Sequence, residues 1–151
     1  MESVSAIAPS SDMPPNTSAN SSPTGKALSD LRILVAEDNE DMWTLTRLYL
    51  TRAGAIPIRA ANGEDAITKA CKEEISLVLM DIQMPVMDGL SAARELRKKG
   101  FEKPILALTA HAMKFHKELS IESGCNEHLT KPIDPRILVD KITEYCRDLL
   151  H

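Results

Sequence analysis

From position 29 onward, short apolar runs alternate with segments whose apolar residues recur every three or four positions. The apolar runs predict strands that are buried on both faces, as in parallel sheets. They cover residues 31–36, 75–80 and 105–108, and weaker or shorter strand-like segments cover residues 56–60 and 128–130. The intervening segments predict amphipathic helices. They cover residues 41–53, 62–71, 90–99 and 113–123 and a final stretch from 135 to 149. Strands that alternate with helices favour an α/β fold with a doubly wound parallel sheet.

Two of the predicted helices carry a clear apolar pattern. The first, residues 41–53, ends before Gly54, and its apolar residues near helical spacing are Met42, Leu45, Leu48 and Tyr49. The last begins at Pro135, a favoured first residue of a helix. Its apolar residues, at spacings of three and four, are Leu138, Ile142, Tyr145 and Leu149. The spacing predicts that each set lines one face of its helix.

Polar groups stand where four of the five predicted strands end. The first strand runs into Glu37 and Asp38, the third into Asp81, the fourth into Thr109, and the fifth into Lys131. A carboxylate at the end of a buried strand is costly unless it has a partner. Because open α/β sheets bind ligands at the carboxyl ends of their strands, we expect these groups to share one crevice.

The types of residue in this crevice point to phosphoryl chemistry. Carboxylates that lie close together repel one another, and a bound cation is one remedy. Hard oxygen ligands suit Mg²⁺, with Mn²⁺ as the alternative ion. A metal ion, the Lys131 amine and the Thr109 hydroxyl around Asp81 would stabilise a phosphoryl group in transfer. Asp81 is then the candidate nucleophile, which would form an aspartyl phosphate.

Composition narrows the class of protein. Residues 1–28 are rich in Ser and Pro and predict a disordered tail or linker, which leaves 29–151 as the ordered domain. A net charge of -4 and few aromatic residues argue against direct nucleic-acid binding. No apolar stretch is long enough to cross a membrane. Three cysteines without a CxxC pair fit a reducing, cytoplasmic setting.

These motifs carry a family resemblance. Glu37-Asp38, residues 81–89, Thr109-Ala110 and Lys131-Pro132 resemble the receiver domain of two-component response regulators, and residues 80–89 resemble the receivers of hybrid histidine kinases in particular. The resemblance implies a flavodoxin-like sheet of five parallel strands in the order 2-1-3-4-5, with five helices. It also implies a histidine kinase or a histidine phosphotransfer domain as phosphoryl donor. A downstream effector protein and a second copy of the domain are further implied partners.

The resemblance implies a role for each residue at the sheet edge. Asp81 would accept the phosphoryl group from a phosphohistidine and ligate Mg²⁺ together with Asp38 and the backbone carbonyl of Gln83. Glu37 would act on the metal through water. The domain would thus catalyse its own phosphorylation and slow dephosphorylation, as a switch protein and not as an enzyme with a separate substrate.

Four further roles concern the switch. Lys131 would pair with the phosphoryl oxygens, and Thr109 would move to hydrogen-bond them and so start a conformational change. His128 stands where the family often has Tyr or Phe as a rotating switch residue, and an imidazole buries less apolar area. Gln83 and His111, each two residues past a site residue, would modulate water access.

Three alternatives remain open at the level of sequence. A haloacid-dehalogenase-type phosphatase uses a similar set of groups but has a second aspartate where this chain has Gln83, which cannot exchange a proton at neutral pH. A receiver-like interaction module would work without phosphorylation. The chain is also compatible both with a free-standing regulator and with the receiver of a hybrid kinase. We expect no direct DNA binding, because the sequence as given leaves no room after Leu150 for an output domain.

Overall fold

A single parallel sheet organises the computed structural model, which describes residues 27–110 and 114–149, without the side chains of 114–117. The five strands are β3 (Arg32–Ala36), β4 (Ile56–Ala60), β5 (Leu77–Asp81), β6 (Ile105–Thr109) and β7 (Glu127–Thr130). Their order across the sheet is β4-β3-β5-β6-β7, and every pair is parallel. Numbered along the chain, this is the order 2-1-3-4-5, so the predicted fold is confirmed.

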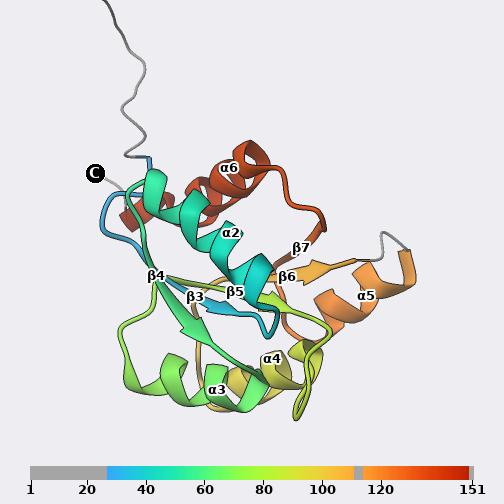
Figure 1. Ribbon diagram of the computed structural model, residues 1–151. Helices are drawn as coiled ribbons and strands as arrows, with labels where there is room; N and C mark the ends of the chain where they lie inside the picture. Colours follow the sequence, from blue (N-terminus) through green and yellow to red (C-terminus); the bar gives the residue numbers. More distant parts are fainter. Residues whose placement is uncertain (1–26, 111–113, 150–151) are drawn as a thin grey trace, which may run out of the picture.

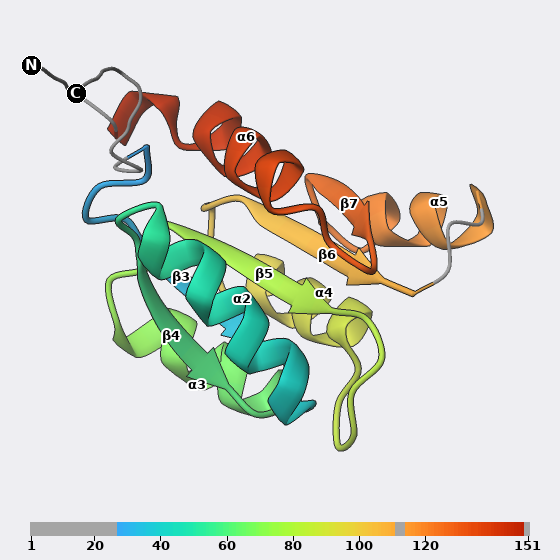
Figure 2. The ribbon, with the colours of Figure 1, turned by 45° about the horizontal axis from the view of Figure 1, so that its top comes forward.

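Helices cover both faces of this sheet (Figure 1). They are α2 (Glu40–Arg52), α3 (Gly63–Lys72), α4 (Gly89–Lys98), α5 (Lys114–Glu122) and α6 (Pro135–Tyr145), followed by the short 3-10 helix η1 (Arg147–Leu149). Figure 2 shows α2 and α6 on one side of the sheet, with α3 and α4 on the other. Four of these helices begin after an Asn or Asp whose side chain accepts a hydrogen bond from a backbone N–H of the first turn.

Two apolar cores follow from the alternation of side chains along the strands. In β3, Ile33 and Val35 pack toward α2 and α6, whereas Leu34 and Ala36 pack toward α3 and α4. All four side chains are fully buried. The central strands β5 and β6 are buried along their whole length, which explains why their sequences are continuous apolar runs.

Helix α2 is rotated relative to the prediction. Leu45 and Leu48, expected on an apolar face, are 37% and 41% exposed, whereas Thr46 and Leu50 are buried. The buried stripe also includes the partly buried Trp43, and it contains a polar residue in its centre. The prediction was therefore wrong for Leu45 and Leu48, because a buried threonine interrupts the apolar pattern, whereas Tyr49 packs against the core as expected.

Both ends of the described domain also differ from the prediction. Leu28, assigned to the tail, is fully buried and its backbone N–H donates to the Ala53 carbonyl at 2.8 Å. Leu149, expected on the apolar face of the last helix, is 48% exposed because the α-helix ends at Tyr145 and η1 follows. Residues 1–26, which make up most of the predicted tail, lie outside the described part of the chain.

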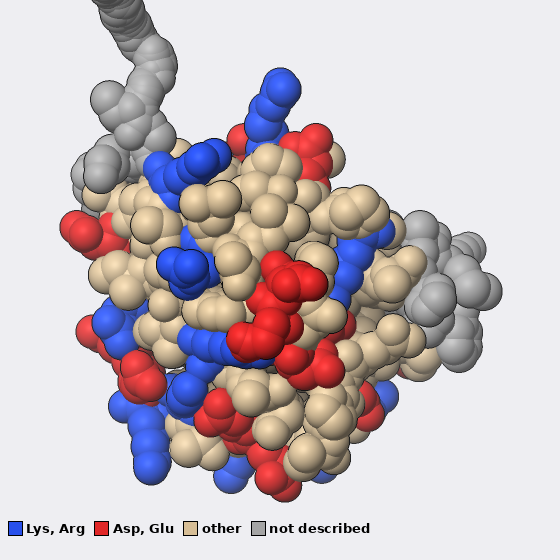
Figure 3. All heavy atoms as spheres, viewed as in Figure 1, with Lys and Arg blue, Asp and Glu red and all other residues tan. Residues whose placement is uncertain are grey.

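The distribution of charged side chains on the surface agrees with the net charge of -4. On the face shown in Figure 3, lysine and arginine side chains are interspersed with acidic ones. That face therefore lacks the broad basic area expected of a nucleic-acid-binding surface. No helix among residues 27–110 and 114–149 is long and apolar enough to cross a membrane.

Candidate functional site

Strand register gathers the predicted site residues at one edge of the sheet. Asp81, the last residue of β5, is paired with Leu108 of β6, one position before Thr109. Thr109 in turn is paired with Thr130, and the next residue, Lys131, donates its backbone N–H to the Thr109 carbonyl at 2.7 Å. Because parallel strands deliver their carboxyl ends to the same edge, residues distant in sequence become neighbours.

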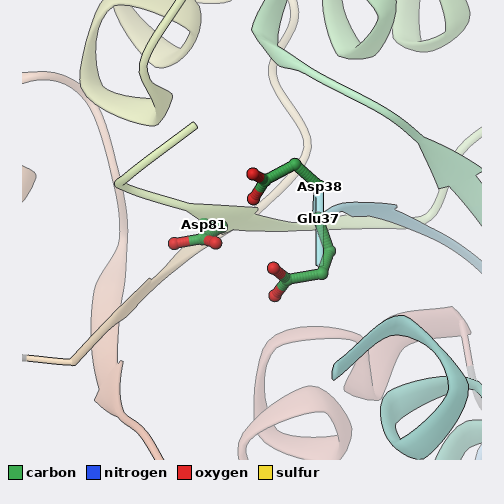
Figure 4. A group of neighbouring side chains, drawn as sticks. All are labelled: Glu37, Asp38 and Asp81. Atoms are coloured by element: carbon green, nitrogen blue, oxygen red, sulfur yellow. The ribbon is translucent and has the colours of Figure 1, made fainter. Parts of the chain in front are cut away.

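An acidic cluster forms the centre of the site. Glu37, Asp38 and Asp81 each place a carboxylate oxygen within 4.8 Å of the others. In Figure 4 the carboxylates of Glu37 and Asp38 both extend toward Asp81 from the segment that follows β3. Glu37 and Asp81 are buried, and Asp38 is exposed. Carboxylate oxygens at this spacing are hard ligands that suit a divalent cation such as Mg²⁺.

Lys131 bridges the two buried acids. Its Nζ lies 3.2 Å from Oε1 of Glu37 and 3.0 Å from Oδ2 of Asp81. Burial would lower the pKa of this amine, but the hydrogen bond and the charge of Asp81, followed by those of Glu37, raise it above its usual value. The lysine therefore stays positively charged beside the Asp81 carboxylate, where it could neutralise an incoming anion.

Glu37 is held in an unfavourable electrostatic environment. Burial, followed by the hydrogen bond and the charge of Asp81, raises its pKa from 4.5 to about 7, although Lys131 acts in the opposite direction. One lysine thus compensates only part of the charge of the cluster. A bound cation would relieve the remaining repulsion, which is an independent reason to expect one here.

The turn after β5 holds Asp81 in place. The backbone N–H of Gln83 donates to Oδ1 of Asp81 at 3.1 Å, and the backbone N–H of Gly89 donates to the Ile82 carbonyl at 3.0 Å. A Cβ atom on Gly89 would lie 2.2 Å from the carbonyl oxygen of Asp81. Only glycine therefore allows the start of α4 to approach Asp81 so closely. Asp88 caps this helix by accepting from the Ser91 N–H at 2.9 Å.

A hollow of about 580 Å³ opens beside the acidic cluster. Its polar lining residues are Asp38, Gln83, Asp88, Ser91 and Arg94. Because Asp38 both lines the hollow and belongs to the cluster, a ligand that enters from solvent can reach the acids.

For the other predicted site residues, the structure gives a position in the fold but does not test their roles. Thr109 is buried at the end of β6, which lies next to β5 in the sheet. His128 is half-buried on β7, and its role as a switch residue stays a prediction, as do the roles of Thr109 and of the Gln83 carbonyl. His111 lies outside the described residues.

Arg59 is a site residue that the sequence analysis missed. Its guanidinium donates to the backbone carbonyls of Glu37 and Asp38. The residue lies in β4, next to the last position of that strand. The rule that polar residues stand at the ends of strands does not find Arg59, because this residue lies inside its strand, before Ala60.

Comparison with known proteins identifies the family. Residues 33–143 match the model of the response regulator receiver domain. The chain is 39% identical over 105 residues to the alkaline phosphatase synthesis transcriptional regulatory protein PhoP of Bacillus subtilis, and it is 37% identical over 134 residues to hybrid signal transduction histidine kinase I of Dictyostelium discoideum. These matches cover 70% and 82% of the chain but only 44% and 8% of the two relatives.

Solved structures agree with this assignment. The receiver domain of sensor histidine kinase PA1611 from Pseudomonas aeruginosa, with a magnesium ion in its active-site cleft, is 31% identical with a TM-score of 0.74, and the match covers 79% of this chain and 99% of that one. The Ssk1 receiver domain of Saccharomyces cerevisiae, crystallised with the phosphotransfer protein Ypd1, is 29% identical with the same TM-score of 0.74, covering 82% of this chain and 93% of that one. The chain therefore belongs to the response regulator receiver domain family of two-component phosphorelays.

Proposed function

We propose that this receiver domain accepts a phosphoryl group on Asp81 from a phosphohistidine, with Mg²⁺ bound at the acidic cluster, and thereby changes its conformation and its partners. The observation that carries the proposal is the geometry around Asp81. Its buried carboxylate lies 3.0 Å from a charged lysine and within 4.8 Å of two further carboxylates, where the strands of the parallel sheet have their carboxyl ends.

The residues of the acidic cluster fit the proposed metal. Asp38 and Asp81 would hold Mg²⁺ together with the backbone carbonyl of Gln83, and Glu37 would act through water. Mn²⁺, which takes similar oxygen ligands, would serve as the substitute. When bound, the ion would neutralise charge on the phosphoryl oxygens during transfer.

The transfer itself needs only one new bond. An Oδ atom of Asp81 attacks the phosphorus, the P–N bond to the donor histidine breaks, and its electron pair stays on the imidazole nitrogen. Lys131 would move from its carboxylate partners to the phosphoryl oxygens, and the Thr109 hydroxyl would donate a hydrogen bond to them. Asp81 ends as an acyl phosphate and needs no separate general base, because it reacts as the carboxylate.

Slow hydrolysis would turn this intermediate into a signal. Position 83, two residues past the acceptor, carries a glutamine, which cannot serve as a general base for water. Membership of the receiver family also argues against the haloacid-dehalogenase alternative. The domain would therefore catalyse its own phosphorylation and a slow dephosphorylation.

The proposed partners follow from the relatives. A histidine kinase or a histidine phosphotransfer domain would donate the phosphoryl group, as the Ypd1 complex of a relative suggests. Thr109 and His128 would transmit the change to an effector protein or to a second copy of the domain. We place this activity in the cytoplasm, where the three unpaired cysteines would stay reduced.

Mass spectrometry of the intact protein tests the proposal. Incubation with acetyl phosphate and Mg²⁺ is expected to add one phosphoryl group to the wild-type protein and none to Asp81→Asn or to a sample with EDTA. Labelling of Asp81→Asn would overturn the assignment of the acceptor. A folded wild-type protein that stays unlabelled with acetyl phosphate and with phosphorylated kinase would favour the interaction module instead.

A further inference from the structure

Arg59 connects three parts of the molecule around the acidic cluster. Its Nε and Nη2 atoms donate to the carbonyl oxygens of Glu37 and Asp38, each at 3.2 Å. Its Nη1 atom pairs with the carboxylate of Glu40 in the first turn of α2. Figure 2 shows β4, the strand that carries Arg59, at the edge of the sheet next to β3 and beneath α2. One planar guanidinium therefore binds successive peptide groups of the segment that carries two acids of the cluster.

The same segment is held by two other backbone contacts. The Glu37 N–H donates to the Ala60 carbonyl at 3.0 Å, and the Asn39 N–H donates to Oε2 of Glu37 at 3.3 Å. Ala60 is the neighbour of Arg59 in β4. Two adjacent residues of one strand thus fix the N–H of Glu37 and the carbonyls of Glu37 and Asp38. Because these peptide groups fix the Cα–Cβ directions of both residues, their positions restrict where the carboxylates can lie.

We propose that Arg59 is a positioning residue for the cation site: by holding the carbonyls of Glu37 and Asp38, it keeps their carboxylates in a geometry that binds a divalent cation. This inference rests on the proposed function, since it assumes that the cluster binds Mg²⁺. Trp43 of α2 supports the arrangement, because the Arg59 guanidinium carbon lies 5.8 Å from the centre of its ring. A lysine could not replace the arginine, since a single ammonium lacks the planar fork.

Geometry and charge make opposite predictions for the loss of this residue. The positive charge of Arg59 alone would repel a cation, so its removal would tighten Mg²⁺ binding. Loss of the fork would instead loosen the acids and weaken binding. Because Glu40 already neutralises much of the guanidinium charge, we expect the geometric effect to be the larger one.

Calorimetric titration with Mg²⁺ separates the two effects. Arg59→Gln removes both charge and fork, and Arg59→Lys keeps the charge alone. We expect both variants to bind Mg²⁺ more weakly, with Kd raised on the order of 10-fold, as for outer partners of metal ligands. Far-UV circular dichroism checks that the variants remain folded, because the fluorescence of Trp43, which lies against Arg59, would respond to the substitution itself.

Arg32 supplies a matched control. At the other end of β3, its Nε donates to the Glu74 carbonyl at 2.7 Å and its Nη2 contacts Oε1 of Glu73 at 3.0 Å. Arg32→Gln therefore breaks a similar fork far from the cluster, and it should leave the Kd for Mg²⁺ within about 2-fold of wild type. An equal loss of Mg²⁺ affinity in this control, or an unchanged or tighter Kd in Arg59→Gln, would overturn the inference.

Hydrogen exchange tests the positioning role without a metal. In EDTA, the amides of Glu37 and Asn39 should exchange faster in Arg59→Gln than in wild type and Arg32→Gln. If the wild-type protein bound no Mg²⁺ and accepted no phosphoryl group, the proposed function would fail. Unchanged exchange in Arg59→Gln would separately refute the claim that Arg59 holds the segment from Glu37 to Asn39. If wild type binds Mg²⁺ and becomes phosphorylated while Arg59→Gln matches it, only the inference about Arg59 is lost.

Discussion

Replacement of Glu37 by glutamine is expected to stabilise the metal-free domain. Burial and the neighbouring Asp81 raise the pKa of Glu37 from 4.5 to about 7, so its ionisation is less favourable in the folded than in the unfolded protein. A difference of this size corresponds to about 3 kcal/mol of lost stability once the group is ionised. A glutamine amide resembles the protonated carboxyl, so Glu37→Gln should recover most of that amount above pH 7. For a domain of this size, such a gain is a substantial fraction of the total stability.

The pH dependence gives the prediction its sign. Between pH 4.5 and 7 the folded state binds more protons at Glu37 than the unfolded state does, so the contribution of this group to stability falls as pH rises. The stability excess of Glu37→Gln over wild type should therefore be near zero below pH 4.5, grow through this window and level off above pH 7. Urea denaturation in EDTA at a series of pH values measures it, provided that the m-values agree.

Glu127 provides a control of opposite sign. Burial raises its pKa, but the hydrogen bonds from Lys141 and Tyr145, together with the charges of Lys141 and His128, outweigh burial and lower it. Its contribution to stability is therefore present above the ordinary pKa and lost as pH falls, so Glu127→Gln should destabilise the domain near pH 8. If Glu37→Gln gave no gain at pH 8, or the same gain at pH 4 and pH 8, the electrostatic account of the cluster would be refuted.

Three further predictions test other parts of the structure. Gly89→Ala would place a Cβ 2.2 Å from the Asp81 carbonyl oxygen, so it should lower the free energy of unfolding by more than about 2 kcal/mol and slow phosphorylation. Gly100→Ala, at a residue with φ +89° and open space around it, should lower it by only about 1 kcal/mol. Urea denaturation measures both values. Lys131→Met leaves two buried carboxylates without their ammonium partner, so it should destabilise the metal-free domain by about 2 kcal/mol at pH 8. Addition of Mg²⁺ should recover part of this loss. An unchanged urea midpoint would contradict the stabilising role of the salt bridges. A maleimide should modify one thiol, the exposed Cys71, in the native protein and all three in urea, because the other two are buried with pKa values raised to about 11; rapid labelling of three native thiols would contradict the packing.

The sheet and the edge that carries the site were predictable because both depend on simple physical patterns. A strand buried on two faces must be apolar throughout, so β3, β5 and β6 are visible as continuous runs. Parallel pairing then brings the polar residues that follow these strands together, and Asp81 and Lys131 meet although fifty positions separate them in sequence. The doubly wound parallel sheet and the acid–lysine contact thus follow from pattern and topology, whereas the order of the strands was implied by the family resemblance.

The parts that were not predictable depend on contacts that leave no pattern. The buried face of α2 includes the polar Thr46, so its residues do not form a continuous apolar pattern in the sequence. Leu45 and Leu48 do follow a helical spacing, but they lie on the exposed side. Leu28 is a single apolar residue without periodicity, so its burial has no signal in sequence. Arg59 acts on backbone carbonyls, which every residue has, and only the three-dimensional structure shows which ones it reaches.

Localisation of the phosphoryl group tests the central claim most directly. The wild-type protein, phosphorylated with acetyl phosphate and Mg²⁺, can be reduced with borohydride, which converts an aspartyl phosphate to homoserine, and then analysed by peptide mass spectrometry. The account predicts the modification at Asp81 alone, and its absence when Mg²⁺ is withheld. Modification at Asp38 or at another acid, with Asp81 unchanged, would contradict the account.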